Sequence, residues 1–410
     1  MKKFLTMLLT VVLAVSSLGL FTGCGDDGEF KVGLICLHGE SSTYDKNFID
    51  AFNAACAAKG VESIIKVDIA ESTACYDAAA DLVDQGCDLI FADSFGHEDH
   101  MIKAANEFRG VQFFHATGTK AHTETLTNYH NAFASIYEGR YLAGIAGGMK
   151  LKELLDAGSL KAENFDANGN VKVGYVGAWT YAEVISGFTS WFLGVRSVVP
   201  NVVMDVQFTG SWYDEAAEKT AAELLISKGC ALISQHADSM GAPTACETAG
   251  IPNVSYNGST ATQCPNTFIV SSRINWQPYY ELIIDSVKNN KIVPLDWSQS
   301  LGSEWGNGSV ALTSLGNAAA EGTEEAINEA IAKLKDGSLK VFDLSKFTVN
   351  GNALADDHKA DVDTDAAFTP DTVVIKTTES GIKYFAESEF RSAPYFDLCI
   401  DGITYLNTKY

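Results

Sequence analysis

The sequence is short of basic residues, and beyond its first segment it has no long apolar run. Its 410 residues include 29 Lys or Arg against 52 Asp or Glu, a formal net charge of −23 at pH 7. A surface this acidic repels nucleic acid and anionic lipid headgroups, so neither is expected as a partner. No later apolar run approaches the ~20 residues that a membrane-spanning helix needs. A globular chain of this length has room for two or three domains.

Motifs that mark common catalytic and metal sites are also missing. The sequence contains no GxSxG elbow, no HExxH and no Walker A loop. Its nine cysteines include no CxxC pair, so a zinc or thioredoxin-type site is unsupported. His97-Glu-Asp-His100 could turn two imidazoles to one helix face, but a solvated first turn is the better interpretation. We therefore expect a protein that is not an enzyme and uses no metal or cofactor.

The first 30 residues have the pattern of an export signal. Lys2 and Lys3 precede an apolar run that ends in Phe21-Thr-Gly-Cys24. A short apolar segment followed by a small residue and a cysteine predicts a lipoprotein signal peptide over residues 1–23. The thiol of Cys24 would take a lipid, and residues 24–30 would tether an exported protein to the extracytoplasmic face of the membrane. An ordinary signal peptide with an incidental cysteine is the alternative.

Two stretches of the chain are near copies of each other, residues 82–94 and residues 225–239. In both, a helix end and a glycine precede a buried strand that finishes in Ala-Asp-Ser. This repeat indicates an internal duplication of an α/β unit. Ligands of open α/β sheets bind at the carboxyl ends of strands, so Asp93 and Asp238 are expected on opposite walls of a cleft. Capping of the next helix is the alternative for both aspartates.

Strand-like and helix-like segments alternate along the chain and then restart at Val171, which predicts two α/β lobes with parallel sheets flanked by helices. We expect lobe 1 to comprise residues 31–136 and about 277–340, and lobe 2 residues 137–276. The glycine-rich helix from Tyr137 to Met149 is expected to pack closely between the lobes. Crossover strands would form a hinge that lets the lobes close over a ligand. Residues 341–410 are less regular and include an acidic loop at 356–365.

Aromatic residues gather where the predicted strands end. Tyr44 follows the first strand, Trp179 and Trp212 follow two strands of the second lobe, and Trp276 ends a crossover strand. Tyrosine and tryptophan present flat apolar faces with a polar edge, as a planar ligand requires. Packing in the core or between the lobes is the competing interpretation for each one.

Polar residues at strand ends supply further candidate contacts. Asp93 and Asp238 could accept hydrogen bonds from an uncharged ligand, and Asn257 could do so or occupy a turn. Lys46 and Arg273 are weaker candidates. His236 could contact the ligand or be an interior histidine with its hydrogen bonds satisfied.

With these residues assembled, the chain resembles the basic membrane protein family of ABC-importer receptors, which includes purine nucleoside receptor lipoproteins. The resemblance runs from about Lys31 to Trp305. Its motifs are Tyr44-Asp-Lys-Asn-Phe48, Glu138-Gly-Arg-Tyr-Leu-Ala-Gly144, Val173-Gly-Tyr-Val-Gly177, Gly187-Phe, Gly210-Ser-Trp-Tyr-Asp214 and Gln235-His-Ala-Asp-Ser239. Residues 341–410 depart from the family pattern.

The resemblance implies a type I periplasmic-binding-protein fold with the ligand stacked on aromatics in the hinge cleft. Carried over to this chain, it implies ligand contacts by Asp238, by Tyr44 and Asp45, and by Trp179. It implies a monomeric receptor that captures a purine base or nucleoside and delivers it to an ABC permease. An exported nucleoside-processing enzyme and a sensor not coupled to transport are the alternatives.

Overall fold

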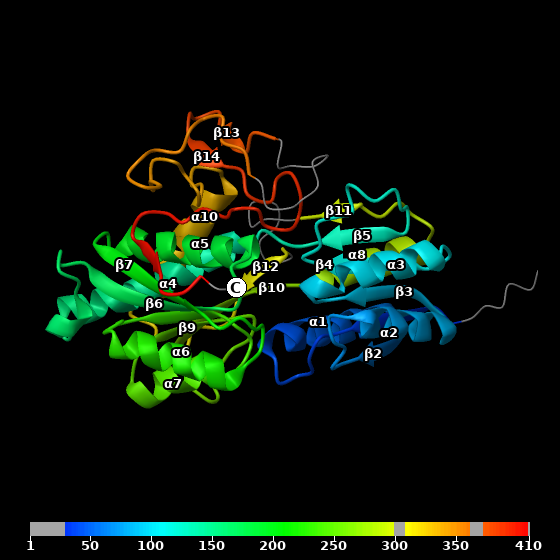
Figure 1. Cartoon of the computed structure of the whole chain (residues 1–410), viewed down its shortest axis with the longest axis horizontal. Coiled ribbons are helices and arrows are strands. Elements are labelled where there is room, and N and C mark those ends of the chain that lie inside the picture. The colour runs from blue at the N-terminus through cyan, green and yellow to red at the C-terminus, as the bar shows by residue number, and fades with distance from the viewer. Residues whose placement is uncertain (1–28, 299–307, 361–371, 409–410) are drawn as a thin grey trace, which may run out of the picture.

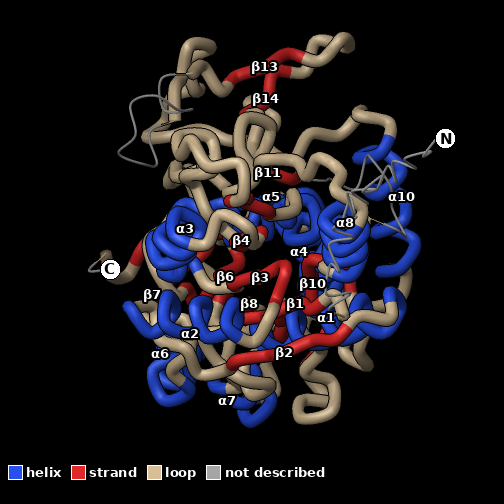
Figure 2. Tube along the Cα trace, turned by 90° about the vertical axis from the view of Figure 1, so that its right-hand side faces the viewer, coloured by secondary structure: helices blue, strands red, loops and turns tan. Residues whose placement is uncertain are grey.

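A computed structural model describes residues 29–298, 308–360 and 372–408 of the chain (Figures 1 and 2). The predicted signal peptide, Cys24 and most of the tether lie outside these residues, as does part of the acidic loop. In the described ranges, no helix combines the length and the apolar character needed to cross a bilayer.

The first lobe is built on a six-stranded sheet with the order β11-β5-β4-β3-β1-β2. Its strands are β1 (Lys31–Ile35), β2 (Glu62–Lys66), β3 (Cys87–Ala92), β4 (Gln112–Ala116), β5 (Tyr129–Ala132) and β11 (Asp296–Trp297). All neighbouring strands run parallel. Val32, Leu34 and Ile35 of β1 are fully buried, because helices cover both faces of the sheet.

Two helices cover each face of this sheet. They are α1 (Thr43–Lys59) and α8 (Gln277–Lys288) on one face, and α2 (Thr73–Asp84) and α3 (Glu98–Glu107) on the other, with the short η1 (Phe95–His97) before α3. Helix α1 begins at a serine cap, because the Ser42 hydroxyl accepts the Asp45 N–H at 3.1 Å. It ends at Gly60, whose φ of 59° is left-handed. The cap fixes the first turn of α1, which carries Tyr44 and Asp45.

The second lobe is built on a seven-stranded sheet with the order β12-β10-β9-β8-β6-β7-β15. Its strands are β6 (Val171–Gly177), β7 (Val202–Phe208), β8 (Ile233–His236), β9 (Asn253–Tyr256), β10 (Phe268–Ile274), β12 (Val310–Leu312) and β15 (Ile403–Tyr405). Only β12 runs antiparallel to its neighbour among the described strands of this sheet. The prediction of two parallel-sheet lobes is therefore confirmed, and Figure 1 shows them side by side, green on the left and blue to cyan on the right.

Helices again lie on both faces of the second sheet. They are α4 (Ile136–Asp156) and α5 (Ala182–Val198) on one face, with α10 (Thr323–Lys335) against α4, and α6 (Glu215–Ser227) and α7 (Gly241–Ala249) on the other; the short η2 spans Ala162–Asn164. A Cβ at Gly144 would lie 2.1 Å from the Trp191 carbonyl oxygen, so α4 and α5 touch backbone to backbone. The prediction that these glycines pack between the lobes is wrong, because α4 lies wholly on the second lobe.

The chain passes between the lobes at the two expected places, near residues 136 and 276, and once more after β11. It enters the second lobe between β5 and α4, returns between β10 and α8, and crosses again between β11 and β12. The expected assignment of residues 277–340 to the first lobe fits α8 and β11 only. Strand β12 and helix α10 belong to the second lobe, since they pair with β10 and pack on α4.

The C-terminal segment is an integral part of the molecule. It forms the hairpin of β13 (Ile375–Thr377) and β14 (Lys383–Phe385) and then adds β15 to the edge of the second sheet. Phe342 stacks on Phe396 with ring centroids 4.2 Å apart. Figure 1 shows this segment in orange and red above the second lobe. The aromatic core of this segment was not predicted from the sequence.

Candidate ligand-binding cleft

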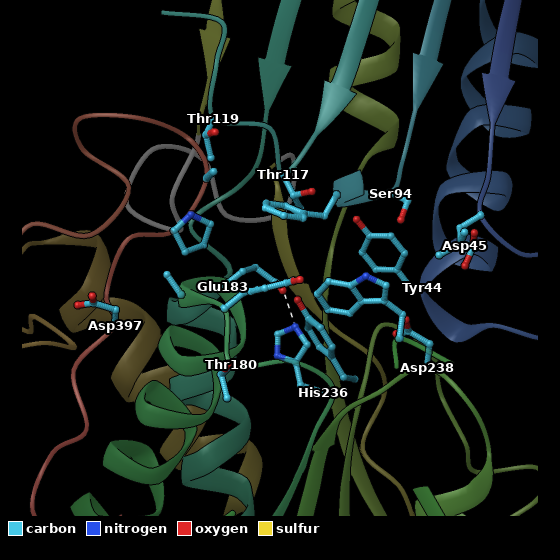
Figure 3. A pocket seen from close by; sticks show the side chains of 18 of the residues that line it. Tyr44, Asp45, Ser94, Thr117, Thr119, Thr180, Glu183, His236, Asp238 and Asp397 are labelled. Atoms are coloured by element: carbon cyan, nitrogen blue, oxygen red, sulfur yellow. Dashed lines mark hydrogen bonds and ion pairs between the residues drawn. The ribbon is translucent and has the colours of Figure 1, made fainter. Parts of the chain in front are cut away.

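A cavity of about 410 Å³ lies between the lobes, at the carboxyl ends of the central strands (Figure 3). The first lobe contributes Leu37, Tyr44, Asp45, Ser94, Phe95, Thr117 and Thr119. The second lobe contributes Thr180, Tyr181, Ala182, Glu183, Trp212, His236, Asp238 and Tyr256, and the C-terminal segment contributes Arg391, Ala393, Pro394 and Asp397. This size and mixture of aromatic and polar groups suit a small solute.

An aromatic cluster forms one wall of the cavity. The rings of Tyr181 and Trp212 lie 6.0 Å apart, and both line the cavity. Trp179 stacks on Tyr181 with centroids 5.7 Å apart and planes 13° apart, but it does not line the cavity itself. The structure thus brings Trp179, Tyr181 and Trp212 together, and Trp179 supports Tyr181 from behind.

Trp276 lies elsewhere, in the core of the first lobe. It is 1% exposed and stacks on Phe48 at 4.5 Å, and Phe91 packs edge-on against it at 5.7 Å. The expected ligand contact by Trp276 is therefore replaced by core packing. The residue is separated from β10 by Asn275 and is the N-cap of α8, at the point where the chain returns to the first lobe.

Asp238 lies on the cavity wall, and the local fold holds it there. Its backbone N–H donates to the Trp212 carbonyl at 3.0 Å, and its carbonyl accepts the Thr43 N–H at 2.9 Å. Burial raises the pKa of the Asp238 carboxyl well above its usual range, and the negative charge of Asp45 adds to the rise. Asn257, in the left-handed region at φ 62°, donates to Asp238 Oδ1 at 3.5 Å from behind the wall. Asn257 therefore positions the carboxyl and is not itself a cavity-lining residue.

Glu218 of α6 supports the turn that carries Asp238. Its carboxyl accepts the N–H of Ser239 at 3.2 Å and that of Asp214 at 3.1 Å. Burial raises the pKa of Glu218 to about 7. No pattern in the sequence links α6 to this turn.

Tyr44 and Asp45 line the opposite, first-lobe side of the cavity, and their contact with a ligand stays a prediction. The Tyr44 hydroxyl donates to the Asp93 carbonyl at 2.7 Å. Asp93 itself is fully buried behind them and does not line the cavity; its Oδ1 accepts the Leu37 N–H at 3.2 Å. The expectation that Asp93 faces the cleft opposite Asp238 is thus not met, and neither aspartate caps a helix. Asp93 instead joins the ends of β1 and β3.

Cys36, Asp45 and Asp93 form a buried group whose ligand atoms lie within 4.8 Å of one another. One thiol and two carboxyl groups could hold a metal ion by type and spacing. Burial raises the pKa values of both the Cys36 thiol and the Asp93 carboxyl well above their usual ranges, which disfavours the charged forms that bind metals. Asp45 also accepts the His38 N–H at 2.7 Å and the Ser42 hydroxyl at 2.5 Å. The three groups thus form a hydrogen-bonded cluster at the ends of β1 and β3.

His236 and Glu183 form a pair in the second-lobe wall of the cavity. His236 Nε2 lies 2.8 Å from Glu183 Oε1, and the His236 ring packs on Tyr256 at 4.6 Å (Figure 3). His236 was a candidate from the sequence, whereas Glu183 and Tyr256 were not. Tyr256 ends β9 one residue before Asn257, so the strand-end argument identified the right position but the wrong side chain.

The two lobes touch each other around the cavity. The rings of Phe95 and Tyr181 lie 5.2 Å apart, as do those of His38 and Tyr213. Lys46 instead pairs with Glu40 and Asp50 on the surface. Arg273 donates to Asn47 Oδ1 at 3.3 Å near the crossover. Neither basic candidate lines the cavity.

Two hinged parallel-sheet lobes with a solute-sized aromatic and polar cavity between them define a solute-binding protein. ABC transporter solute-binding proteins from Conexibacter woesei and Aeropyrum pernix share this fold, with TM-scores of 0.59 and 0.62 at 18% and 16% identity. Each alignment covers 76% of this chain, and 98% and 93% of the other chains, respectively.

The chain belongs to the family of PnrA-like ABC transporter substrate-binding proteins, whose profile matches residues 40–334. A purine-binding protein of Brucella abortus is 30% identical over 285 residues, which cover 69% of this chain and 73% of that protein. A Haloferax volcanii protein assigned as the glucose-binding component of an ABC transporter is 31% identical over 200 residues, 49% of this chain. That alignment spans about half of the Haloferax protein, 46%. The family resemblance drawn from the motifs is confirmed, and with it the role of a substrate-binding component working outside the cytoplasm.

Proposed function

We propose that this protein captures a purine base or nucleoside in the cleft between its lobes and delivers it to an ABC permease. The observation that carries the proposal is the pairing of an aromatic wall, Tyr181 and Trp212, with the buried Asp238 carboxyl beside it. The purine-binding relative from Brucella abortus supports the same ligand class.

The protonation of Asp238 suits the edge of a purine. Because burial raises its pKa, the carboxyl stays neutral over a wider pH range than an exposed aspartate. A neutral carboxylic acid offers one donor and one acceptor side by side. The edge of a purine presents ring nitrogens and N–H groups in the same complementary arrangement, while its face would lie on the aromatic wall.

Thermal-shift and calorimetric titration of the purified protein test the ligand class. Adenine, guanine and their nucleosides are expected to stabilise the fold, because a ligand that binds only the folded state raises its stability by about 2.7 kcal/mol at a hundredfold excess over Kd. Stabilisation by glucose alone would instead favour a sugar receptor. Release of free base from a nucleoside would point to an enzyme.

Asp238→Ala is expected to weaken purine binding by about 1–3 kcal/mol, since it removes hydrogen bonds made in a buried site. The control is Asp357→Ala, at an exposed position outside the cleft. Calorimetric titration of both variants measures the effect. Equal affinity in the two variants would contradict a ligand contact by Asp238.

We also propose export with a lipid anchor on Cys24, from the Phe21-Thr-Gly-Cys24 pattern. Cys24→Ala is the direct test. It should release the protein from the membrane fraction of expressing cells, and continued retention would argue against lipidation.

A further inference from the structure

The C-terminal segment supplies part of the ligand cavity although it lies beyond the family profile. The profile ends at residue 334, whereas Arg391, Ala393, Pro394 and Asp397 line the cavity. We name residues 386–398, which carry these four side chains, the C-terminal strap. The strap is therefore an addition to the part of the chain that the family profile covers.

The strap is held firmly at both ends on the second lobe. Before it, the Phe385 N–H donates to the Phe342 carbonyl at 3.0 Å, and Phe342 packs on Tyr137 of α4 with centroids 5.3 Å apart. After it, Ile403 of β15 pairs with Met204 of β7 in the main sheet. The strap is therefore an anchored wall, because its two ends belong to a packed core and to a sheet.

The middle of the strap reaches the first lobe. The Ser392 N–H donates to Asp296 Oδ2 at 2.8 Å, and Asp296 lies on β11 at the edge of the first sheet. The same carboxyl oxygen lies 2.8 Å from His122 Nε2. The strap thus spans from the second lobe to the first beside the cavity.

Arg391 fixes the turn that faces the cavity. Arg391 is only 4% exposed. Its guanidinium donates from Nε to the Ala393 carbonyl at 3.2 Å and from Nη2 to the Pro394 carbonyl at 3.3 Å. These bonds tie the guanidinium to the strap's own backbone. They leave Ala393 and Pro394 as a compact, mostly apolar part of the wall.

The strap lies at the end of the cavity away from Asp238. Figure 3 shows Asp397 at one end, and Asp45 and Asp238 at the other. Trp212 lies beside Asp238, since the two share a backbone hydrogen bond of 3.0 Å. A planar ring held at Trp212 and Asp238 would therefore direct its substituents toward the strap.

We propose that the C-terminal strap is a specificity-determining wall that limits the size of the substituent on a bound purine. Ala393 and Pro394 restrict this size, because both line the cavity and the hydrogen bonds of Arg391 to their carbonyls hold their turn in place. The inference rests on the proposed purine-binding function.

The test uses the full-length chain with Pro394→Gly, and with Asp357→Asn as an exposed control. Affinities for adenine, adenosine and adenosine monophosphate are measured by calorimetry, and the melting temperature of each variant confirms folding. Pro394→Gly should raise the affinities for adenosine and adenosine monophosphate relative to adenine, because it removes a ring that lines the cavity.

If wild type binds purines but Pro394→Gly keeps its ratios of affinity among the three ligands, the strap is not a specificity wall. If wild type binds none of the three ligands, the proposed function itself fails, and the strap inference falls with it. A shift of all three affinities by the same factor would show a general effect on closure and would also overturn the inference.

Discussion

Single residues in this cleft divide into those that line the cavity and those that hold the lining in place. Asp238 and Trp212 line it, whereas Asn257 and Trp179 stand behind them. The sequence could predict that aromatic and carboxyl groups gather at strand ends. It could not predict which of two adjacent side chains faces the ligand, because that depends on packing between distant elements.

Trp212 and Trp276 provide a direct comparison. Both follow a strand in the sequence, but Trp212 lines the cavity and Trp276 lies in the core of the first lobe. Trp212→Ala should weaken purine binding clearly while changing the free energy of unfolding little, since the ring is partly exposed in the cavity. Trp276→Ala should destabilise the fold by about 3–5 kcal/mol, as large buried aromatics do when truncated. Denaturant unfolding and ligand titration of both variants separate the two effects. The opposite pattern would reverse the two assignments.

At the scale of elements, the alternation of strands and helices could be predicted for most elements as far as β10, although β5 was not predicted. The continuous apolar runs of β1 and β6 and the left-handed Gly86 and Gly229 after α2 and α6 carry that information locally. Strands β12 and β15 have three residues each and exist only because a neighbouring strand offers an open edge. Such short pairings leave almost no periodic pattern in the sequence.

Arg140 is a buried side chain of helix α4 that forms hydrogen bonds with the second sheet. Its guanidinium donates to the Tyr175 hydroxyl at 2.6 Å and the Ser234 hydroxyl at 3.1 Å, and lies 4.7 Å from the centre of the Tyr256 ring. It therefore supports Tyr256, which lines the cavity, from behind. The Arg140 motif was noted in the sequence only as a family feature.

Arg140→Lys is expected to destabilise the protein by about 1–3 kcal/mol, because an ammonium group cannot reach the same set of acceptors and leaves some unsatisfied. Ligand affinity should fall as well, since Tyr256 loses a planar support. Arg109→Lys, at an exposed arginine of the first lobe, is the control. If the free energy of unfolding and the ligand affinity are unchanged in Arg140→Lys, then Arg140 does not connect α4 to the cleft.

For the whole molecule, the balance of buried titratable groups decides how stability depends on pH. Glu387 is 1% exposed, and burial raises its pKa from 4.5 to about 7. Between these values the folded chain keeps a proton that the unfolded chain loses. The stability that this group contributes is therefore fully present below about pH 4.5 and is lost as the pH rises through 7.

Glu387→Gln should remove this dependence. The stability of the variant relative to wild type is expected to rise by about 3 kcal/mol between pH 4.5 and pH 8. Urea unfolding at a series of pH values measures the difference, with the exposed Glu379→Gln as the control. His97 and His130, whose pKa values burial lowers to about 4, act in the opposite direction but equally in both proteins. If the stabilities of the variant and of wild type change with pH in parallel, Glu387 does not titrate with a raised pKa.

The distribution of thiols has a practical consequence. Among the described residues, Cys399 is exposed and the other seven cysteines are buried without disulfides. A maleimide dye would therefore label the folded protein at Cys399, the residue that follows the strap. Burial raises the pKa of this thiol, so coupling should proceed faster at alkaline pH. The native sequence thus carries its own attachment point for a fluorophore that reports movement of the lobes in solution.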